Sequence, residues 1–299
     1  MPEKIKVLIT DLDNTLFDWV EIWYESFSAM LDQLVRDSGV PRKKLINEIK
    51  KIHEKYGTSE YAFLIEELPS LQELHQKEDI ISIYDEAIHR FRSQRKKYLR
   101  LFPRVEETLM DIRKKGTLVV GYTESMAFYS NHRVRNLGLD ERLDYLYSPA
   151  DHDLPKGLTP EQIRKYPAEQ YELSHCEHRN TPPGELKPNP KMLLDIISDL
   201  GARPDECIYV GDNLMKDVVM AQEAGVTDIH AAYGEAHHRD EYQLLRDVTH
   251  WPDKHVQQEK KLSPEHVKPR YSLENSFGEL LEFFEFSKFK TRGLHGQEN

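Results

Sequence analysis

Short hydrophobic runs alternate with longer segments of helical periodicity along this chain. The run Ile5–Thr10 is mostly apolar and stops at an acidic cluster, which is typical of a buried strand that ends in a loop. Similar runs, separated by helix-length segments, follow at Leu118–Tyr122, Tyr145–Tyr147 and Cys207–Val210. This alternation predicts an α/β fold with a Rossmann-like parallel sheet and helices on both of its faces.

The first two predicted strands are separated by far more sequence than one crossover helix needs. Apolar residues in this stretch recur at helical spacing, which indicates an all-helical subdomain inserted into the α/β core. We therefore expect a catalytic core at 1–17 and 97–286, a helical cap at 18–96, and a flexible tail at 287–299.

Two later segments are polar and show no sustained period. Residues 148–184 are expected to form mostly loop, with one short helix near Glu161–Lys165, and residues 235–268 have a similar composition. The stripe Phe277–Phe284 predicts a final helix that docks on the core.

Composition and charge exclude several classes of partner. The chain has 41 Lys and Arg against 52 Asp and Glu, a formal charge of -11, so we expect neither nucleic acid nor a membrane surface as a partner. Two cysteines cannot build a disulfide framework, and the N-terminus lacks the apolar run of a signal peptide. These features favour the cytoplasm, and they leave open whether the protein is a monomer or a homo-oligomer.

Polar residues follow the predicted strands at four places. Asp11 and Asp13 end the first strand, where alternate carboxylates can face a ligand, Asp11 to attack phosphorus and Asp13 to move a proton. The other three places are Gly121–Ser125, with a hydroxyl and backbone N–H groups, Lys187 before a helix, and Gly211–Asn213 with Asp217, an oxygen-rich set suited to a hard cation.

This ordered set resembles the haloacid dehalogenase superfamily of aspartate-nucleophile hydrolases. The family signatures DxDxT, a strand-end Thr or Ser, a Lys, and GDxxxxD stand here as DLDNT, Thr123, Lys187 and GDNLMKD. The resemblance extends from residue 4 to about 286. Family members with a first-position cap have that cap at the place where the helical insertion lies in this chain.

The resemblance implies a magnesium-dependent phosphomonoester hydrolase that acts on a small phosphorylated metabolite through an aspartyl-phosphate intermediate. Asp11 would be the nucleophile, Asp13 the acid and base, and Thr123 and Lys187 would bind the transferring phosphoryl group. We expect further substrate contacts from Thr15, Glu124 and Ser125. The expected Mg²⁺ ligands are the Asp11 side chain, the Asp13 carbonyl group, Asp212 and Asp217.

Three alternatives remain beside the phosphatase hypothesis. One is hydrolytic dehalogenation of a 2-haloacid, although a halide leaving group needs no proton donor such as Asp13. A second is a phosphoacceptor module, and a third is a catalytically silent binding protein on the same scaffold.

Other residues with metal-binding, basic or aromatic side chains are interpreted as structural. The residues His152, His175, Cys176, Glu177 and His178 are possible zinc ligands, but their spacing matches no closed four-ligand pattern. The basic run Arg92–Arg100 is interpreted as a solvated helix face. The aromatic stripe that begins at Trp19 is interpreted as cap core, with Trp19 and Tyr24 as candidates for substrate contact.

Overall fold

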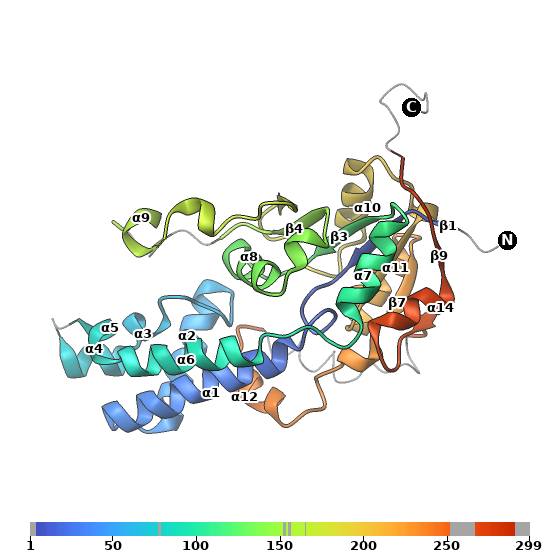
Figure 1. The fold of residues 1–299 in the computed structure, drawn as a ribbon. Helices are drawn as coiled ribbons and strands as arrows, with labels where there is room; N and C mark the ends of the chain where they lie inside the picture. The colour runs from blue at the N-terminus through green and yellow to red at the C-terminus, as the bar shows by residue number, and fades with distance from the viewer. Residues whose placement is uncertain are drawn as a thin grey trace. The chain divides into compact units, whose positions relative to one another are not determined.

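The computed structural model describes residues 4–76, 79–151, 154, 157–164, 166–251 and 267–290 (Figure 1). The chain divides into two compact units. The first comprises the described residues of Met1–Asp18, Arg100–Glu235 and Leu262–Asn299, and the second comprises those of Trp19–Leu99 and Ala236–Lys261.

The first unit is built on a seven-stranded sheet with the strand order β5-β4-β3-β2-β6-β7-β8, in which every pair is parallel. Its strands are β2 (Val7–Thr10), β3 (Leu118–Tyr122), β4 (Tyr145–Pro149), β5 (Glu177–Thr181), β6 (Cys207–Gly211), β7 (Thr227–His230) and β8 (Tyr271–Ser272). The predicted α/β class and parallel sheet are confirmed. In the register of the central strands, Thr10 lies opposite Gly121 on β3 and Val210 on β6, so three of these strands end side by side.

Helices lie on both sides of this sheet (Figure 1). The helices of the first unit are α7 (Val105–Lys114), α8 (Ala127–Asn136), α9 (Pro160–Ile163), α10 (Pro190–Asp199) and α11 (Met220–Glu223), with a π-helix, η4 (Leu214–Val219), and short 3-10 turns at Leu139–Glu141, Ala168–Gln170, Pro204–Glu206 and Ala232–Gly234. Helix α9 belongs to the long connection between β4 and β5. Alternate strand residues such as Val7 and Ile9 pack with Leu193 and Ile196 of α10 in one buried cluster. These strands are buried on both faces, which explains their continuous apolar sequence.

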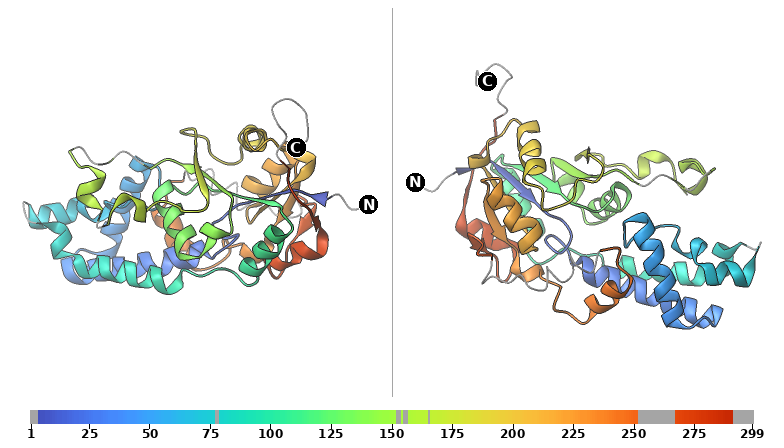
Figure 2. Two further views of the ribbon diagram at one scale, coloured as in Figure 1. Left: turned by 45° about the horizontal axis from the view of Figure 1, so that its top comes forward. Right: turned by 180° about the vertical axis from the view of Figure 1, so that it is seen from behind.

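The C-terminal segment returns to the N-terminal strand. Strand β1 (Lys4–Ile5) pairs in parallel with β9 (Glu285–Phe286), and the two run side by side in Figure 2. The predicted final helix consists of a 3-10 turn, η6 (Phe277–Glu279), and α14 (Leu280–Phe283), and both Phe277 and Leu280 are fully buried. Residues 291–299 of the predicted tail lie outside the described residues.

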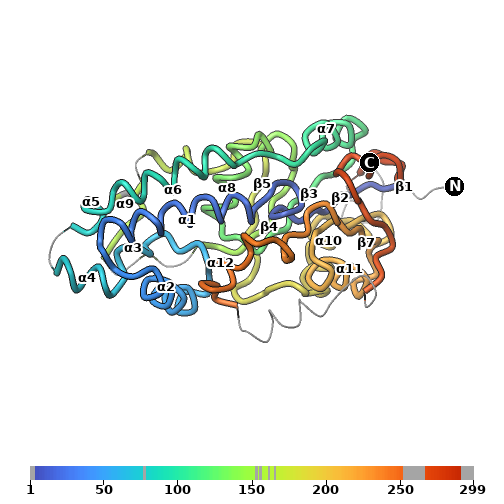
Figure 3. Tube along the Cα trace, turned by 90° about the horizontal axis from the view of Figure 1, so that it is seen from below, coloured from blue at the N-terminus to red at the C-terminus, as the bar shows by residue number. Residues whose placement is uncertain are grey.

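The second unit is helical. It contains α1 (Trp19–Ser38), α2 (Arg42–Tyr56), α3 (Leu64–Glu67), α4 (Pro69–His75), α5 (Ile80–Ile83), α6 (Asp85–Tyr98) and α12 (Glu241–Val248). Helix α12 packs on α1 and α2, as Figure 3 shows. The interpretation of residues 235–268 as a polar segment is therefore incomplete, because the segment contains α12, whose apolar side chains Tyr242, Leu245 and Val248 recur every third residue and are buried.

The interpretation of residues 148–184 as mostly loop is also wrong in part. The expected short helix is present as α9, but Glu177–Thr181 forms β5, which pairs with β4 alone at the edge of the sheet. An edge strand is solvated on one side, so its sequence EHRNT carries no hydrophobic signal.

Candidate active site

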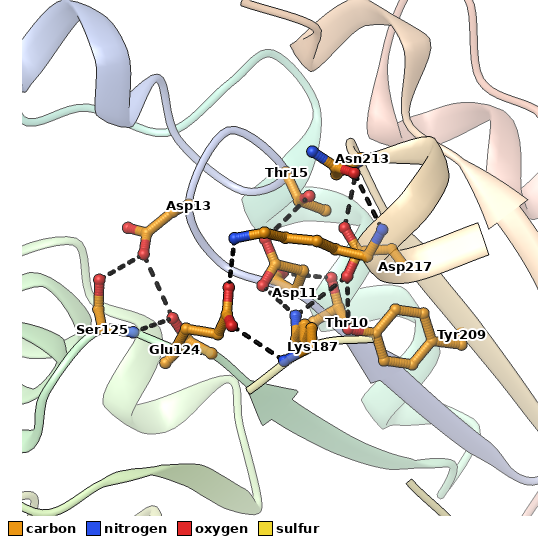
Figure 4. A network of polar contacts seen from close by, with 12 residues as sticks. Thr10, Asp11, Asp13, Thr15, Glu124, Ser125, Lys187, Tyr209, Asn213 and Asp217 are labelled. Atoms are coloured by element: carbon orange, nitrogen blue, oxygen red, sulfur yellow. Dashed lines mark hydrogen bonds and ion pairs between the residues drawn. The ribbon is translucent and has the colours of Figure 1, made fainter. Parts of the chain in front are cut away.

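The carboxylate of Asp11 lies directly after β2, the central strand of the sheet. Its backbone N–H donates to the Val210 carbonyl group at 2.8 Å, so the ladder with β6 continues to this residue. One carboxylate oxygen, Oδ1, accepts a hydrogen bond from Lys187 Nζ at 2.5 Å, and the other lies 3.5 Å from Thr15 Oγ1 (Figure 4). Asp11 is only 7% exposed, and burial raises its pKa to about 8 although Lys187 opposes this shift.

The loop after Asp11 is fixed by a tight turn. Asn14 has a φ of 58°, in the left-handed region that Asn tolerates better than most residues. Gly234 packs against this turn so closely that a Cβ there would lie 1.8 Å from the Asn14 carbonyl oxygen. Tyr233 Oη donates to the Thr15 carbonyl oxygen at 2.6 Å, so two consecutive residues after β7 hold the loop.

Asp13 lies apart from the partners of Asp11 and has its own set of donors. Its Oδ2 atom accepts hydrogen bonds from Ser125 Oγ at 2.6 Å and from Thr123 Oγ1 at 3.2 Å, and Oδ1 lies 3.2 Å from Arg133 Nη1. Arg133 Nη1 also donates to Ser125 Oγ at 3.0 Å. The strand-end hydroxyl groups predicted to face a phosphate therefore contact Asp13 in this structure.

Lys187 lies at the centre of the site. Its ammonium group donates to Asp11 and, at 3.0 Å, to Asp217 Oδ1, and it lies over the rings of Tyr122 and Tyr209. Burial alone would lower the pKa of Lys187, but the charges of Asp11 and Asp217 outweigh it and hold that pKa well above the usual value. Lys187 is therefore a permanent buried cation.

The carboxylate of Glu124 joins two parts of the site. It accepts the backbone N–H of Lys187 at 2.9 Å and Lys216 Nζ at 2.7 Å. Burial opposes ionisation, but Lys216 outweighs it and holds the pKa of Glu124 below its usual range. Both oxygens of this carboxylate are thus engaged by protein donors, and its charge lies beside two lysines.

Three carboxylates converge where a cation could bind. Oxygens of Asp11, Asp212 and Asp217 lie within 4.8 Å of one another. Asp217 folds back over Gly211, where a Cβ would lie 2.3 Å from its Cγ atom, so only glycine fits at this strand end. Carboxylate oxygens are the preferred ligands of Mg²⁺, and this set therefore fits a magnesium ion.

A protein-family model described as haloacid dehalogenase-like hydrolase matches residues 5–225. The chain belongs to the haloacid dehalogenase-like hydrolases. The glyceraldehyde 3-phosphate phosphatase of Methanopyrus kandleri is 22% identical to this hydrolase over 237 residues, 77% of this chain and 85% of the relative. The protein of the same name from Pyrococcus furiosus is 23% identical over 234 residues, 78% of this chain and 82% of its own.

The 2-haloacid dehalogenase structure from Pseudomonas syringae pv. Tomato DC3000 superposes on the hydrolase with a TM-score of 0.53. The match has 20% sequence identity and covers 93% of this chain and 97% of the other, which shows the shared fold. No helix in the described ranges of this hydrolase combines the length and apolar character that crossing a membrane requires.

Arg133 and Tyr209 are among the residues of the hydrolase's site that the sequence analysis did not single out. Arg133 lies on α8 and is 4% exposed, in a buried stripe with Ser130 and Val134. An arginine at the i+3 position of such a stripe is a detectable signal, because a buried charge needs a partner. Tyr209 lies within the apolar run of β6, where an aromatic residue is common and gives no such signal.

The possible zinc ligands do not come together in the described part of the chain. Asp140 accepts the backbone N–H groups of residues 174–176, and His178 on β5 is hydrogen-bonded to Ser148 Oγ at 2.7 Å. His152 lies outside the described residues. No cluster of ligand atoms among the described residues includes these side chains.

Proposed function

We propose that this hydrolase is a magnesium-dependent phosphatase that cleaves a small phosphomonoester through a phosphorylated Asp11. The observation that carries the proposal is that the carboxylates of Asp11 and Asp13 have different hydrogen-bond and ion-pair partners. Asp11 is paired with Lys187 beside Asp217, whereas Asp13 is held by Ser125 and Arg133. One carboxylate is thus available for attack on phosphorus and the other for proton transfer.

In the first step a carboxylate oxygen of Asp11 attacks phosphorus, and the bond from phosphorus to the ester oxygen breaks. Asp13 gives its proton to the departing alkoxide. In the second step Asp13 takes a proton from a water molecule, which attacks the same phosphorus atom and releases inorganic phosphate and Asp11. Two carboxylates in distinct environments suit this exchange of roles.

Lys187 offsets the negative charge of the transferring phosphoryl group and restrains Asp11 through their 2.5 Å contact. Thr123, Ser125 and Thr15 are proposed to contribute hydroxyl or backbone donors to the phosphoryl oxygens. Glu124 accepts the backbone N–H of Lys187 at 2.9 Å and so fixes the Lys187 backbone. We therefore propose that Glu124 positions Lys187.

The proposed magnesium ligands are Asp11, the Asp13 carbonyl group, Asp212 and Asp217. Bound magnesium would supply positive charge that offsets the charge of the phosphoryl group, and would hold Asp11 ionised despite its burial. The donor set supports this assignment because three carboxylates meet beside one lysine.

A small phosphorylated metabolite is the proposed substrate class, and two relatives that span most of the chain are named as phosphatases of glyceraldehyde 3-phosphate. We propose that the enzyme acts in the cytoplasm. Cys176 and Cys207 are both free and buried, which fits a reducing compartment.

The proposal is tested by a screen of phosphorylated metabolites that measures phosphate release with magnesium or with EDTA. We expect release from at least one triose phosphate or related small ester, loss of activity in EDTA, and recovery when magnesium is added back. A parallel assay measures chloride release from 2-chloropropionate. Chloride release without phosphate release would contradict the proposal and favour the dehalogenase alternative.

A further inference from the structure

Two buried tyrosines flank the ammonium group of Lys187. Tyr122 ends β3 and Tyr209 lies on β6, the two strands that border β2, and the rings are 1% and 0% exposed. The Nζ atom lies 4.8 Å from the ring centre of Tyr122 and 5.5 Å from that of Tyr209. Both rings belong to the apolar cluster beneath α10, so they give Lys187 similar aromatic surroundings.

The two hydroxyl groups differ, although the rings are alike. Tyr209 Oη donates to Asp217 Oδ1 at 2.9 Å, the same oxygen that accepts Lys187 Nζ at 3.0 Å (Figure 4). Tyr122 Oη is buried and has no hydrogen-bond partner among the residues that the structure describes. One tyrosine therefore takes part in the polar network, whereas the other contributes its ring.

The hydroxyl of Tyr209 restricts how Asp217 can turn. Asp217 is 2% exposed, and its second oxygen accepts the backbone N–H of Asn213 at 3.1 Å. Three donors on two oxygens thus fix the plane of the carboxylate. Removing the Tyr209 hydroxyl leaves Oδ1 with the hydrogen bond from Lys187 alone.

We propose that Tyr209 is a positioning residue that holds Asp217 in the orientation required for a divalent cation and for Lys187. This inference rests on the proposed function, because Asp217 is assigned there to the magnesium site. Partners that orient metal-ligating carboxylates are worth about 10- to 100-fold in metal affinity or activity in well-studied enzymes. A buried tyrosine in the sheet, outside the four signatures, thereby supports the orientation of a proposed metal ligand.

The test compares Tyr209→Phe with Tyr122→Phe, each of which removes one buried hydroxyl beside Lys187 and keeps the ring. Magnesium binding is measured by isothermal titration calorimetry on the full chain without substrate. We expect Tyr209→Phe to weaken magnesium binding about 10-fold, the lower end of the range for such partners, and Tyr122→Phe to change it less than about 2-fold. Thermal unfolding of both variants verifies that they are folded.

A double-mutant cycle with Asp217→Asn separates positioning from a general effect on packing. If Tyr209 acts through Asp217, Tyr209→Phe should cause little further loss of magnesium affinity in the Asp217→Asn background. Equal effects of the two Phe variants, or an undiminished loss in the Asp217→Asn background, would overturn the inference and leave the phosphatase proposal intact. A wild-type protein that binds no magnesium would contradict the metal site itself, and with it both proposals.

Discussion

A buried histidine should make the helical unit unstable in mild acid. His53 on α2 is fully buried, and its Nδ1 atom donates to the Val248 carbonyl oxygen of α12 at 2.8 Å. Its other ring nitrogen, Nε2, has no partner among the described residues. Burial lowers the pKa of His53 to about 4, and the hydrogen bond to Val248 offsets this shift only in part.

The sign and size of the change in unfolding free energy follow from the pKa of His53 in the unfolded chain and in the folded unit. The unfolded chain takes up a proton at His53 near the ordinary histidine pKa of 6.5, whereas the folded unit takes it up only near pH 4. The neutral ring therefore contributes stability above pH 6.5, and this contribution is lost as the pH falls toward 4. At about 1.4 kcal/mol per pKa unit the whole shift corresponds to roughly 3 kcal/mol, of which about 2.5 kcal/mol is lost by pH 4.5.

The assay is urea unfolding at pH 4.5 to 7.5, followed by tryptophan fluorescence. All three tryptophans, at positions 19, 23 and 251, lie in the helical unit, so the signal reports its unfolding. The test variant is His53→Asn, whose side-chain amide can donate to the Val248 carbonyl oxygen without titrating in this range. The control is His89→Asn, because His89 is exposed on α6 of the same unit.

We expect the free energy of unfolding to fall with pH about 2.5 kcal/mol less in His53→Asn than in wild-type protein. The His89→Asn variant should keep the wild-type dependence. Parallel pH profiles for wild-type protein and His53→Asn, within about 0.5 kcal/mol, would refute the reasoning from burial.

Three further predictions concern the site. Asp13→Ala should slow phosphoryl transfer from an alkyl phosphate at least about 10²-fold more than from p-nitrophenyl phosphate in single turnovers, and equal losses would exclude Asp13 as the proton donor. Gly211→Ala should cost about 1–3 kcal/mol of stability in urea unfolding and weaken magnesium binding, because the new methyl group collides with Asp217. Calcium should support turnover poorly, since its larger and more flexible ligand shell places carboxylate and phosphoryl oxygens less well. Equal rates with both ions would contradict the proposed dependence on magnesium.

Much of the fold could be predicted because buried parallel strands leave a strong hydrophobic signal. The runs that form β2, β3 and β6 are apolar on both faces, and their order fixes which residues meet at the carboxyl edge of the sheet. Strand β5 could not be found in this way, because an edge strand of polar residues has neither a hydrophobic run nor a regular alternation.

The sequence also does not show that α12 belongs to the helical unit, and the reason is a different one. Its partners α1 and α2 lie about two hundred residues earlier in the chain, and the contact from His53 to Val248 spans 195 residues. A local pattern of three apolar residues indicates a buried helical face but does not specify which unit buries it.

The candidate site could likewise be predicted only in part. Asp11, Lys187, Asp212 and Asp217 could be assigned from the spacing of their signatures, and the structure brings their side chains together. Partners supplied by other elements depend on three-dimensional packing. The local spacing in α8 indicates only that Arg133 is buried; that its partner is Asp13 depends on how the elements pack.

The central claim is that Asp11 becomes covalently phosphorylated. Its most direct test is an acid quench of the enzyme during turnover of a ³²P-labelled substrate identified by the screen, with the label mapped by peptide analysis. We expect an acid-stable, hydroxylamine-sensitive label on the peptide that contains Asp11 in wild-type protein, and neither label nor turnover in a folded Asp11→Asn variant. Wild-type rates of phosphate release in Asp11→Asn, or a label that maps to another residue, would contradict the account.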